Sequence, residues 1–153
     1  MKNDIHEKSG RAIPTMLDYK THIENDSLFN TPPVFPIYVC MATLEWLKEI
    51  GGVSAIEKIN TQKAELLYNE IDSNPLFKGT ADVGSRSKMN VCFLLEKPEL
   101  DESFSALLKE SGIIGLKGHR SVGGYRASLY NALPLSSVEF LVSLMQDFAK
   151  KNG

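Results

Sequence analysis

The strongest hydrophobic pattern in the chain begins after Asn30-Thr31-Pro32-Pro33. From Val34 to Ile50 apolar residues recur at helical spacing and cover most of the helix surface, which predicts a long and largely buried helix. Gly51-Gly52 ends this pattern. Asn30 or Thr31 can cap the first turn, where proline is tolerated because its missing N–H is not needed.

Two further elements follow. Ser54 and Glu57 have the spacing of a capping box, which predicts a second helix that stops at the sequence Asp-Ser-Asn-Pro, residues 72–75. The period then changes to two in KMNVCFLL, residues 88–95, which predicts a strand with one fully apolar face. A weaker strand is expected over residues 80–83.

The last third of the chain predicts two helices and two strands. Asp101 can cap a short helix that Gly112 ends, and residues 113–118 and 123–130 have the composition of strands. Ser136 and Glu139 form another capping box, which begins a final helix. The residues expected to be buried on this helix are Val138, Leu141, Val142, Met145 and Phe148.

Short strands with tight connections between helices favour an α+β fold, with a mainly antiparallel sheet and helices packed on one face. Residues 1–30 show no sustained period, so we expect an irregular segment there. A self-contained domain seldom begins with so long a weakly patterned stretch, and we therefore expect the chain to begin inside a larger parent protein.

Composition narrows the class of protein. The formal net charge is -2, which gives no reason to expect a general affinity for nucleic acid or anionic membranes. The polar N-terminus has no signal peptide and no segment approaches a membrane span, so we expect a cytoplasmic protein. Cys40 and Cys92 have no partner at metal-ligand spacing, and we expect reduced, mostly buried thiols and no metal site.

One short segment gathers positive charge. In GLKGHRSVGGYRAS, residues 115–128, glycines separate Lys117, His119, Arg120 and Arg126, and no acidic residue lies between Glu110 and Glu139. A guanidinium is a planar fork that matches carboxylate or phosphate, and glycine lets the backbone approach a ligand. The segment therefore predicts a pocket for a small dianion, or else a solvated loop whose arginines pair with distant carboxylates.

A second candidate site is the sequence SLFNTPP, residues 27–33. A helix N-terminus with an amide or hydroxyl side chain beside it can bind an anion, although Asn-Thr-Pro also begins many helices by capping alone. The chain has no phosphate-binding glycine loop, no metal-ligand cluster and no nucleophile motif. Its recognisable chemistry is the holding of anions.

Four segments together resemble the C-terminal half of the phosphoserine aminotransferase family. They are IPTMLDYKTHIENDSLFNTPPVFPIYV (13–39), WLKEIGG (46–52), RSKMNVCF (86–93) and GLKGHRSVGGYRASLYNA (115–132). That family belongs to the class V, fold-type I enzymes that use pyridoxal phosphate. It is a homodimer that exchanges an amino group between glutamate and 3-phosphooxypyruvate, giving phosphoserine and 2-oxoglutarate, in serine and pyridoxal phosphate biosynthesis.

The resemblance implies roles for five residues. Asn30 and Thr31 are expected to contact the cofactor phosphate of the other subunit. Arg126 is expected to bind the substrate α-carboxylate, and His119 and Arg120 the phosphate of phosphoserine or the side-chain carboxylate of glutamate. It also implies a division into a tail of the large pyridoxal phosphate domain (1–30), an interdomain helix (31–52) and a small α+β domain (53–153).

The family's Schiff-base lysine lies upstream of the matched region, so we expect the chain alone to bind no cofactor and to be inactive. In the parent, the large domain and the other subunit would cover the apolar helix that follows Pro33. In this chain the helix should be exposed and should favour self-association. The alternative is a free-standing module that keeps the small-domain fold and binds an anionic metabolite or a partner without catalysis.

Overall fold

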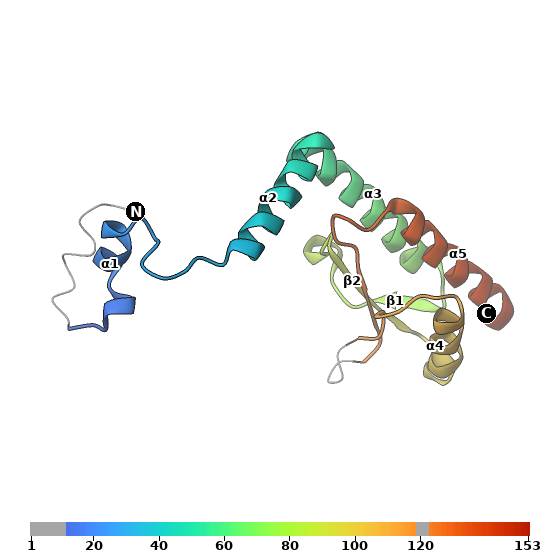
Figure 1. The fold of residues 1–153 in the computed structure, drawn as a ribbon. Helices are drawn as coiled ribbons and strands as arrows, with labels where there is room; N and C mark the ends of the chain where they lie inside the picture. Colours follow the sequence, from blue (N-terminus) through green and yellow to red (C-terminus); the bar gives the residue numbers. More distant parts are fainter. Residues whose placement is uncertain (1–11, 119–122) are drawn as a thin grey trace. The chain divides into compact units, whose positions relative to one another are not determined.

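The computed structural model describes residues 12–118 and 123–153. Its contacts divide the chain into two compact units, Met1–Trp46 and Leu47–Gly153 (Figure 1).

The first unit contains short helices that the sequence pattern did not predict. A 3-10 helix covers Thr15–Leu17, and α1 covers Tyr19–Glu24. The side chain of Asp18 caps α1 by accepting a hydrogen bond from the Lys20 N–H at 3.0 Å. The expectation of a wholly irregular segment is therefore wrong, because a local cap can begin a helix too short to show a hydrophobic period.

Helix α2 spans Val34–Glu49, close to the predicted range. It begins directly after Pro33, so neither Asn30 nor Thr31 occupies its capping position. None of its residues is buried, and Phe35 is 75% exposed. The expectation of a buried helix is wrong for this chain, because a hydrophobic pattern records a need for burial without showing what supplies it.

The second unit is built on a three-stranded antiparallel sheet in the order β1-β2-β3. Strand β1 covers Phe77–Gly79, β2 covers Asn90–Leu95 and β3 covers Tyr125–Ser128. Two 3-10 helices, Val83–Ser85 and Pro98–Leu100, lie in the connections.

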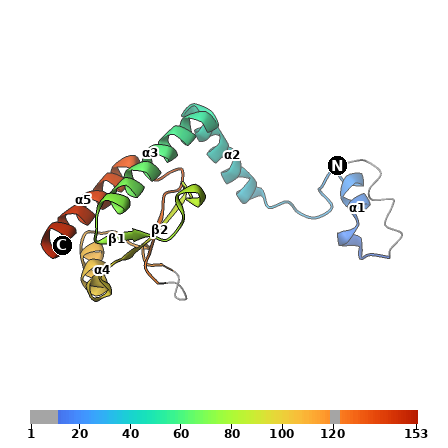
Figure 2. The same cartoon turned by 180° about the vertical axis from the view of Figure 1, so that it is seen from behind.

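Three helices pack on one face of this sheet: α3 (Gly52–Ser73), α4 (Asp101–Glu110) and α5 (Leu135–Asn152). Both views show α3 and α5 side by side (Figures 1 and 2). The core between sheet and helices contains a cluster of aromatic rings, with centroid separations of 5.0 to 5.8 Å. Its members are Phe77, Phe93, Phe104, Tyr125 and Phe148. The predicted α+β class is confirmed.

The predicted helix starts were wrong in detail. Helix α3 begins at Gly52 after Gly51, whose φ of 102° is left-handed, and α5 begins after Pro134. Neither helix has a side-chain cap, so the two predicted capping boxes are absent. Asp101 lies inside the first turn of α4, where its charge favours the helix dipole, and does not cap it.

Two strand predictions also failed. The strand expected at residues 80–83 lies earlier, at Phe77–Gly79. Residues 113–118 contribute only an isolated bridge between Lys117 and Tyr125.

Among the residues that the structure describes, no helix is both long and apolar enough to cross a membrane.

Candidate functional site

Arg126 projects from the open face of the sheet. Along β3 and the residue that follows it, Tyr125, Ala127 and Leu129 are buried, while Arg126 is exposed. This alternation was predicted from the sequence and is confirmed, because side chains on a strand point to opposite faces in turn. The helices cover the face with Tyr125, so Arg126 lies on the other face.

The neighbours of Arg126 on that face are mostly small and polar. Arg126 lies opposite Cys92, and Ser128 lies opposite Asn90, in the register of β3 with β2. The Tyr130 hydroxyl donates to Asn90 Oδ1 at 3.5 Å. Arg126 takes part in none of the ion pairs between described residues. Its guanidinium can therefore donate hydrogen bonds to an external anion.

Two backbone hydrogen bonds join the start and the end of the basic segment, residues 115–128, and so form a closed base beside β3. The Gly118 N–H donates to the Gly124 carbonyl at 2.7 Å, and the Arg126 N–H donates to the Leu116 carbonyl at 2.7 Å. A Cβ on Gly118 would overlap the Gly123 carbonyl oxygen, and Gly124 has a φ of 63°. A Cβ on Gly124 would also overlap the Phe93 carbonyl oxygen, so a larger residue at either position would prevent this close approach.

His119 and Arg120 lie outside the described residues. They follow Gly118 directly in the chain, so their attachment point is the closed base next to Arg126. The predicted grouping of His119, Arg120 and Arg126 around one ligand stays a prediction.

Arg86 is a second arginine near the sheet, and it is already paired. It forms a bidentate ion pair with Asp72, with distances of 2.6 and 2.7 Å, and its guanidinium lies 4.5 Å from the centre of the Tyr68 ring. The hydrogen bond from Arg86 holds the pKa of Asp72 below its ordinary value. Sequence reasoning did not single out this ion pair, which attaches the β1–β2 connection to α3.

Lys63 on α3 was also missed. Its side chain is completely buried, and burial lowers the pKa of its ammonium group. Its position among buried apolar residues of α3 was the available signal, because a lysine on the core face of a helix requires polar partners.

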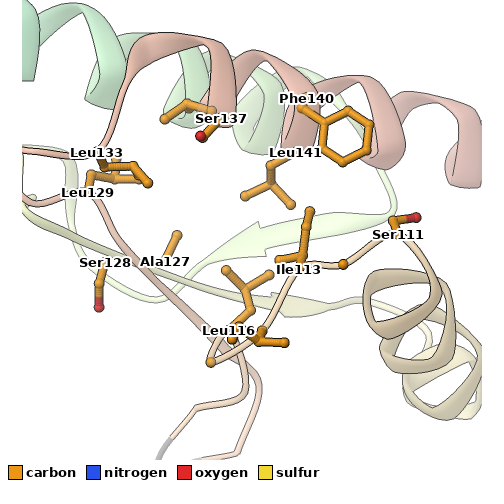
Figure 3. A pocket seen from close by; sticks show the side chains of 14 residues that line it. Ser111, Ile113, Leu116, Ala127, Ser128, Leu129, Leu133, Ser137, Phe140 and Leu141 are labelled. Atoms are coloured by element: carbon orange, nitrogen blue, oxygen red, sulfur yellow. The ribbon is translucent and has the colours of Figure 1, made fainter.

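A pocket of about 370 Å³ lies beside the edge of β3, below α5 (Figure 3). Its walls include Ile113, Leu116, Leu129, Leu133 and Phe140, and none of the described residues that line it is charged. An apolar pocket of this kind does not suit a dianion.

Asn30 and Thr31 lie in the first unit, and both are exposed. The Asn30 amide donates to Met16 Sδ at 3.5 Å, a weak contact that a stronger acceptor can replace. Pro32, Pro33 and Pro36 lack an N–H, and the Val34 N–H is used by the Pro32 carbonyl. The start of α2 therefore has few free N–H groups, and an anion here must depend on the Asn30 and Thr31 side chains.

The sequence model of the family "Aminotransferase class-V" matches residues 6–141. The chain belongs to this family. The phosphoserine aminotransferase of Flavobacterium johnsoniae is 58% identical over 151 residues, which make up 99% of the chain and 42% of that relative. The chain thus spans less than half the length of the curated relatives that it matches.

Solved structures give the same picture. The phosphoserine aminotransferase from Bacillus circulans subsp. alkalophilus superposes with a TM-score of 0.85 at 46% identity, covering 92% of the chain and 39% of that structure. A pyridoxal phosphate-bound phosphoserine aminotransferase from Trichomonas vaginalis gives 0.78 at 37% identity, covering 88% and 39%. The resemblance stated from the sequence motifs is confirmed.

Proposed function

We propose that this class-V aminotransferase chain is the C-terminal part of a phosphoserine aminotransferase, including the small domain of the fold-type I architecture. The reaction converts O-phospho-L-serine and 2-oxoglutarate into 3-phosphooxypyruvate and L-glutamate, and serves serine and pyridoxal phosphate biosynthesis. The names of the matched relatives and the exposed Arg126 on the open face of the sheet support this assignment.

The exposed guanidinium of Arg126 carries the proposal. Both amino-acid substrates have an α-carboxylate and a second anionic group, so the site needs cations at two fixed positions. Arg126 supplies the first and binds the α-carboxylate. His119 and Arg120, which follow the glycine-closed base, supply the second and bind the phosphate or the side-chain carboxylate.

Asn30 and Thr31 suit a cofactor phosphate. An amide N–H₂ and a hydroxyl can each donate to phosphate oxygens, and both side chains are exposed at the approach to α2. Bound pyridoxal phosphate supplies the electron-accepting ring on which amino groups are exchanged. The residues of this chain hold its phosphate and orient the substrate, and the 153-residue chain alone does not turn the substrate over.

The domain assignment stays a prediction: residues 1–30 belong to the large domain, 31–52 to an interdomain helix and 53–153 to the small domain. The whole enzyme is a homodimer, and Asn30 and Thr31 reach the cofactor of the other subunit. The apolar residues of α2, such as Phe35, then drive self-association of the isolated chain.

The decisive experiment is calorimetric titration of the 153-residue chain with phosphoserine. The variant Arg126→Met should bind at least about tenfold more weakly, because it loses a charge-assisted bidentate contact. Lys151→Met removes the same charge at the end of α5 and is the control. Equal affinity of Arg126→Met and the native chain would show that Arg126 does not bind the substrate.

Catalysis and association are tested on the same sample. The chain should form no glutamate from 2-oxoglutarate and phosphoserine, and borohydride should trap no stoichiometric pyridoxal phosphate adduct at a single lysine.

Light scattering should show self-association of the native chain, and the variant Phe35→Ser should reduce it. A strictly monomeric native chain would contradict the proposed association.

A further inference from the structure

Lys63 lies in α3 with a completely buried side chain. Its ammonium group donates to three carbonyl oxygens, those of Leu129 at 3.1 Å, Tyr130 at 2.9 Å and Leu133 at 3.1 Å. None of the ion pairs between described residues includes Lys63. Since burial of an ammonium group is costly, these carbonyls are its main compensation.

All three carbonyls belong to the segment that joins β3 to α5. Leu129 follows directly on β3, and its N–H donates to the Met89 carbonyl at 2.8 Å. Asn60, one turn before Lys63 on α3, donates its side-chain amide to Asn131 Oδ1 at 2.8 Å. Side chains of α3 therefore hold the end of β3 and the residues immediately after it.

This anchor bears on the orientation of Arg126. Strand β3 has only 4 residues, so its own pairing with β2 fixes its register over a short length. A slip of one residue would move Arg126 from the open face into the core, because the side-chain period of a strand is two. Lys63 opposes such a slip, because its ammonium group binds the Leu129, Tyr130 and Leu133 carbonyls in the positions that the present register gives them.

We propose that Lys63 is a positioning residue for the substrate carboxylate. By binding the carbonyls after β3, it holds Arg126 in the register and orientation in which Arg126 pairs with the α-carboxylate. This inference rests on the proposed function, which supplies the role of Arg126.

A purely structural lysine gives a different expectation. If Lys63 only fills the core, then replacing it weakens the fold and lowers the affinity for every ligand of the site by the same factor. If it positions Arg126, then its loss lowers the affinity for ligands with an α-carboxylate and leaves ligands without one almost unchanged.

Phosphoserine and O-phosphoethanolamine separate these cases, because they differ only in the carboxylate. Titration of the 153-residue chain gives the ratio of their dissociation constants, and Arg126→Met sets the ratio expected without carboxylate recognition. In Lys63→Met the preference for phosphoserine should fall by about fivefold or more. Affinity for phosphoethanolamine should change by less than about twofold.

The matched control is Ile71→Ala, further along α3, where the Ile71 side chain lies against β1. It removes core packing without touching the segment after β3, so the affinities for phosphoserine and phosphoethanolamine should fall by the same factor.

A second measurement needs no ligand. Amide hydrogen exchange of residues 126–133 should be faster in Lys63→Met than in Ile71→Ala at equal global stability. If Lys63→Met does not fold, Lys63→Ala with added methylammonium should recover both fold and preference.

The outcomes distinguish the two proposals. If Arg126→Met keeps the preference for phosphoserine, or the native chain shows none, the proposed function fails and hydrogen exchange alone decides whether Lys63 anchors β3. If Arg126→Met loses the preference while folded Lys63→Met keeps it, the inference about Lys63 is overturned. Failure of methylammonium to restore Lys63→Ala would also overturn it.

Discussion

Arg126 and Cys92 form a directly opposed pair across β3 and β2. Arg126 is exposed and Cys92 is partly buried on the open face of the sheet. Side chains in such a pair have Cβ atoms about 5 Å apart. Cys92 is therefore the position on β2 from which a charge would act most directly on Arg126.

The change Cys92→Glu should lower the affinity for phosphoserine. Its carboxylate would pair with the Arg126 guanidinium and compete with added phosphoserine. A cross-strand ion pair of up to about 1 kcal/mol corresponds to a loss of affinity of about fivefold. Calorimetric titration measures the loss. Cys92→Gln has nearly the same size without the charge, and an equal loss in that variant would show that size matters and charge does not.

The closed base of the basic segment gives a second prediction. Gly118→Ala would force the new Cβ against the Gly123 carbonyl, separating Gly118 from Gly124. We expect a loss of about 1–3 kcal/mol in the free energy of unfolding and weaker phosphoserine binding. Urea unfolding checks the first effect. Gly84→Ala is the control because its Cβ would meet nothing within 4 Å, and an equally destabilised Gly84→Ala would contradict the explanation.

Local periodicity predicted part of the fold correctly. The buried residues of α5 were predicted because a helix places positions three and four apart on one face, whatever it packs against. The orientation of Arg126 followed from strand alternation in the same way. Both inferences need only the neighbouring sequence.

Contacts between distant segments were not predictable in this way. The carbonyls that bind Lys63 lie 66 to 70 residues further along the chain, so no local pattern indicates them. Residues 113–118 resemble a strand in composition, yet only Lys117 forms a bridge, because the pairing depends on the path of the backbone around Gly115. The bidentate pair of Arg86 with Asp72 was missed for the same reason.

That ion pair gives a third prediction, concerning acid stability. The pKa of Asp72 is lowered by Arg86, so the pair stabilises the fold above the ordinary aspartate pKa, near 4, and the contribution is lost as the pH falls through the lowered value. Asp72→Asn should cost at most about 1 kcal/mol at pH 7, because Asp72 is half exposed. Urea unfolding of both proteins at several pH values should show the difference disappearing in acid; a constant difference would contradict this.

Tyr125 gives a fourth prediction, at alkaline pH. Its ring is buried in the core, and its hydroxyl donates to the Asp101 carbonyl at 3.0 Å and shares a hydrogen bond with Ser105 at 2.9 Å. Burial raises the pKa of Tyr125 to about 12. Between the ordinary tyrosine pKa, near 10, and this value the unfolded chain ionises while the folded chain does not, so the stabilising contribution of Tyr125 decreases as the pH rises.

Tyr125→Phe should therefore be less stable than the native chain at pH 8 by about 1 kcal/mol, because the Asp101 carbonyl loses its donor. The gap should narrow above pH 10, since phenylalanine has no group to ionise in the unfolded chain. Tyr130→Phe is the matched control, because it removes a hydroxyl from a side chain that is 56% exposed and lies outside the core. Spectrophotometric titration provides an independent check: the native chain should contain a tyrosine that ionises near pH 12 and is absent from Tyr125→Phe. If all tyrosines of the folded chain ionise together near pH 10, Tyr125 is not held in the core as described.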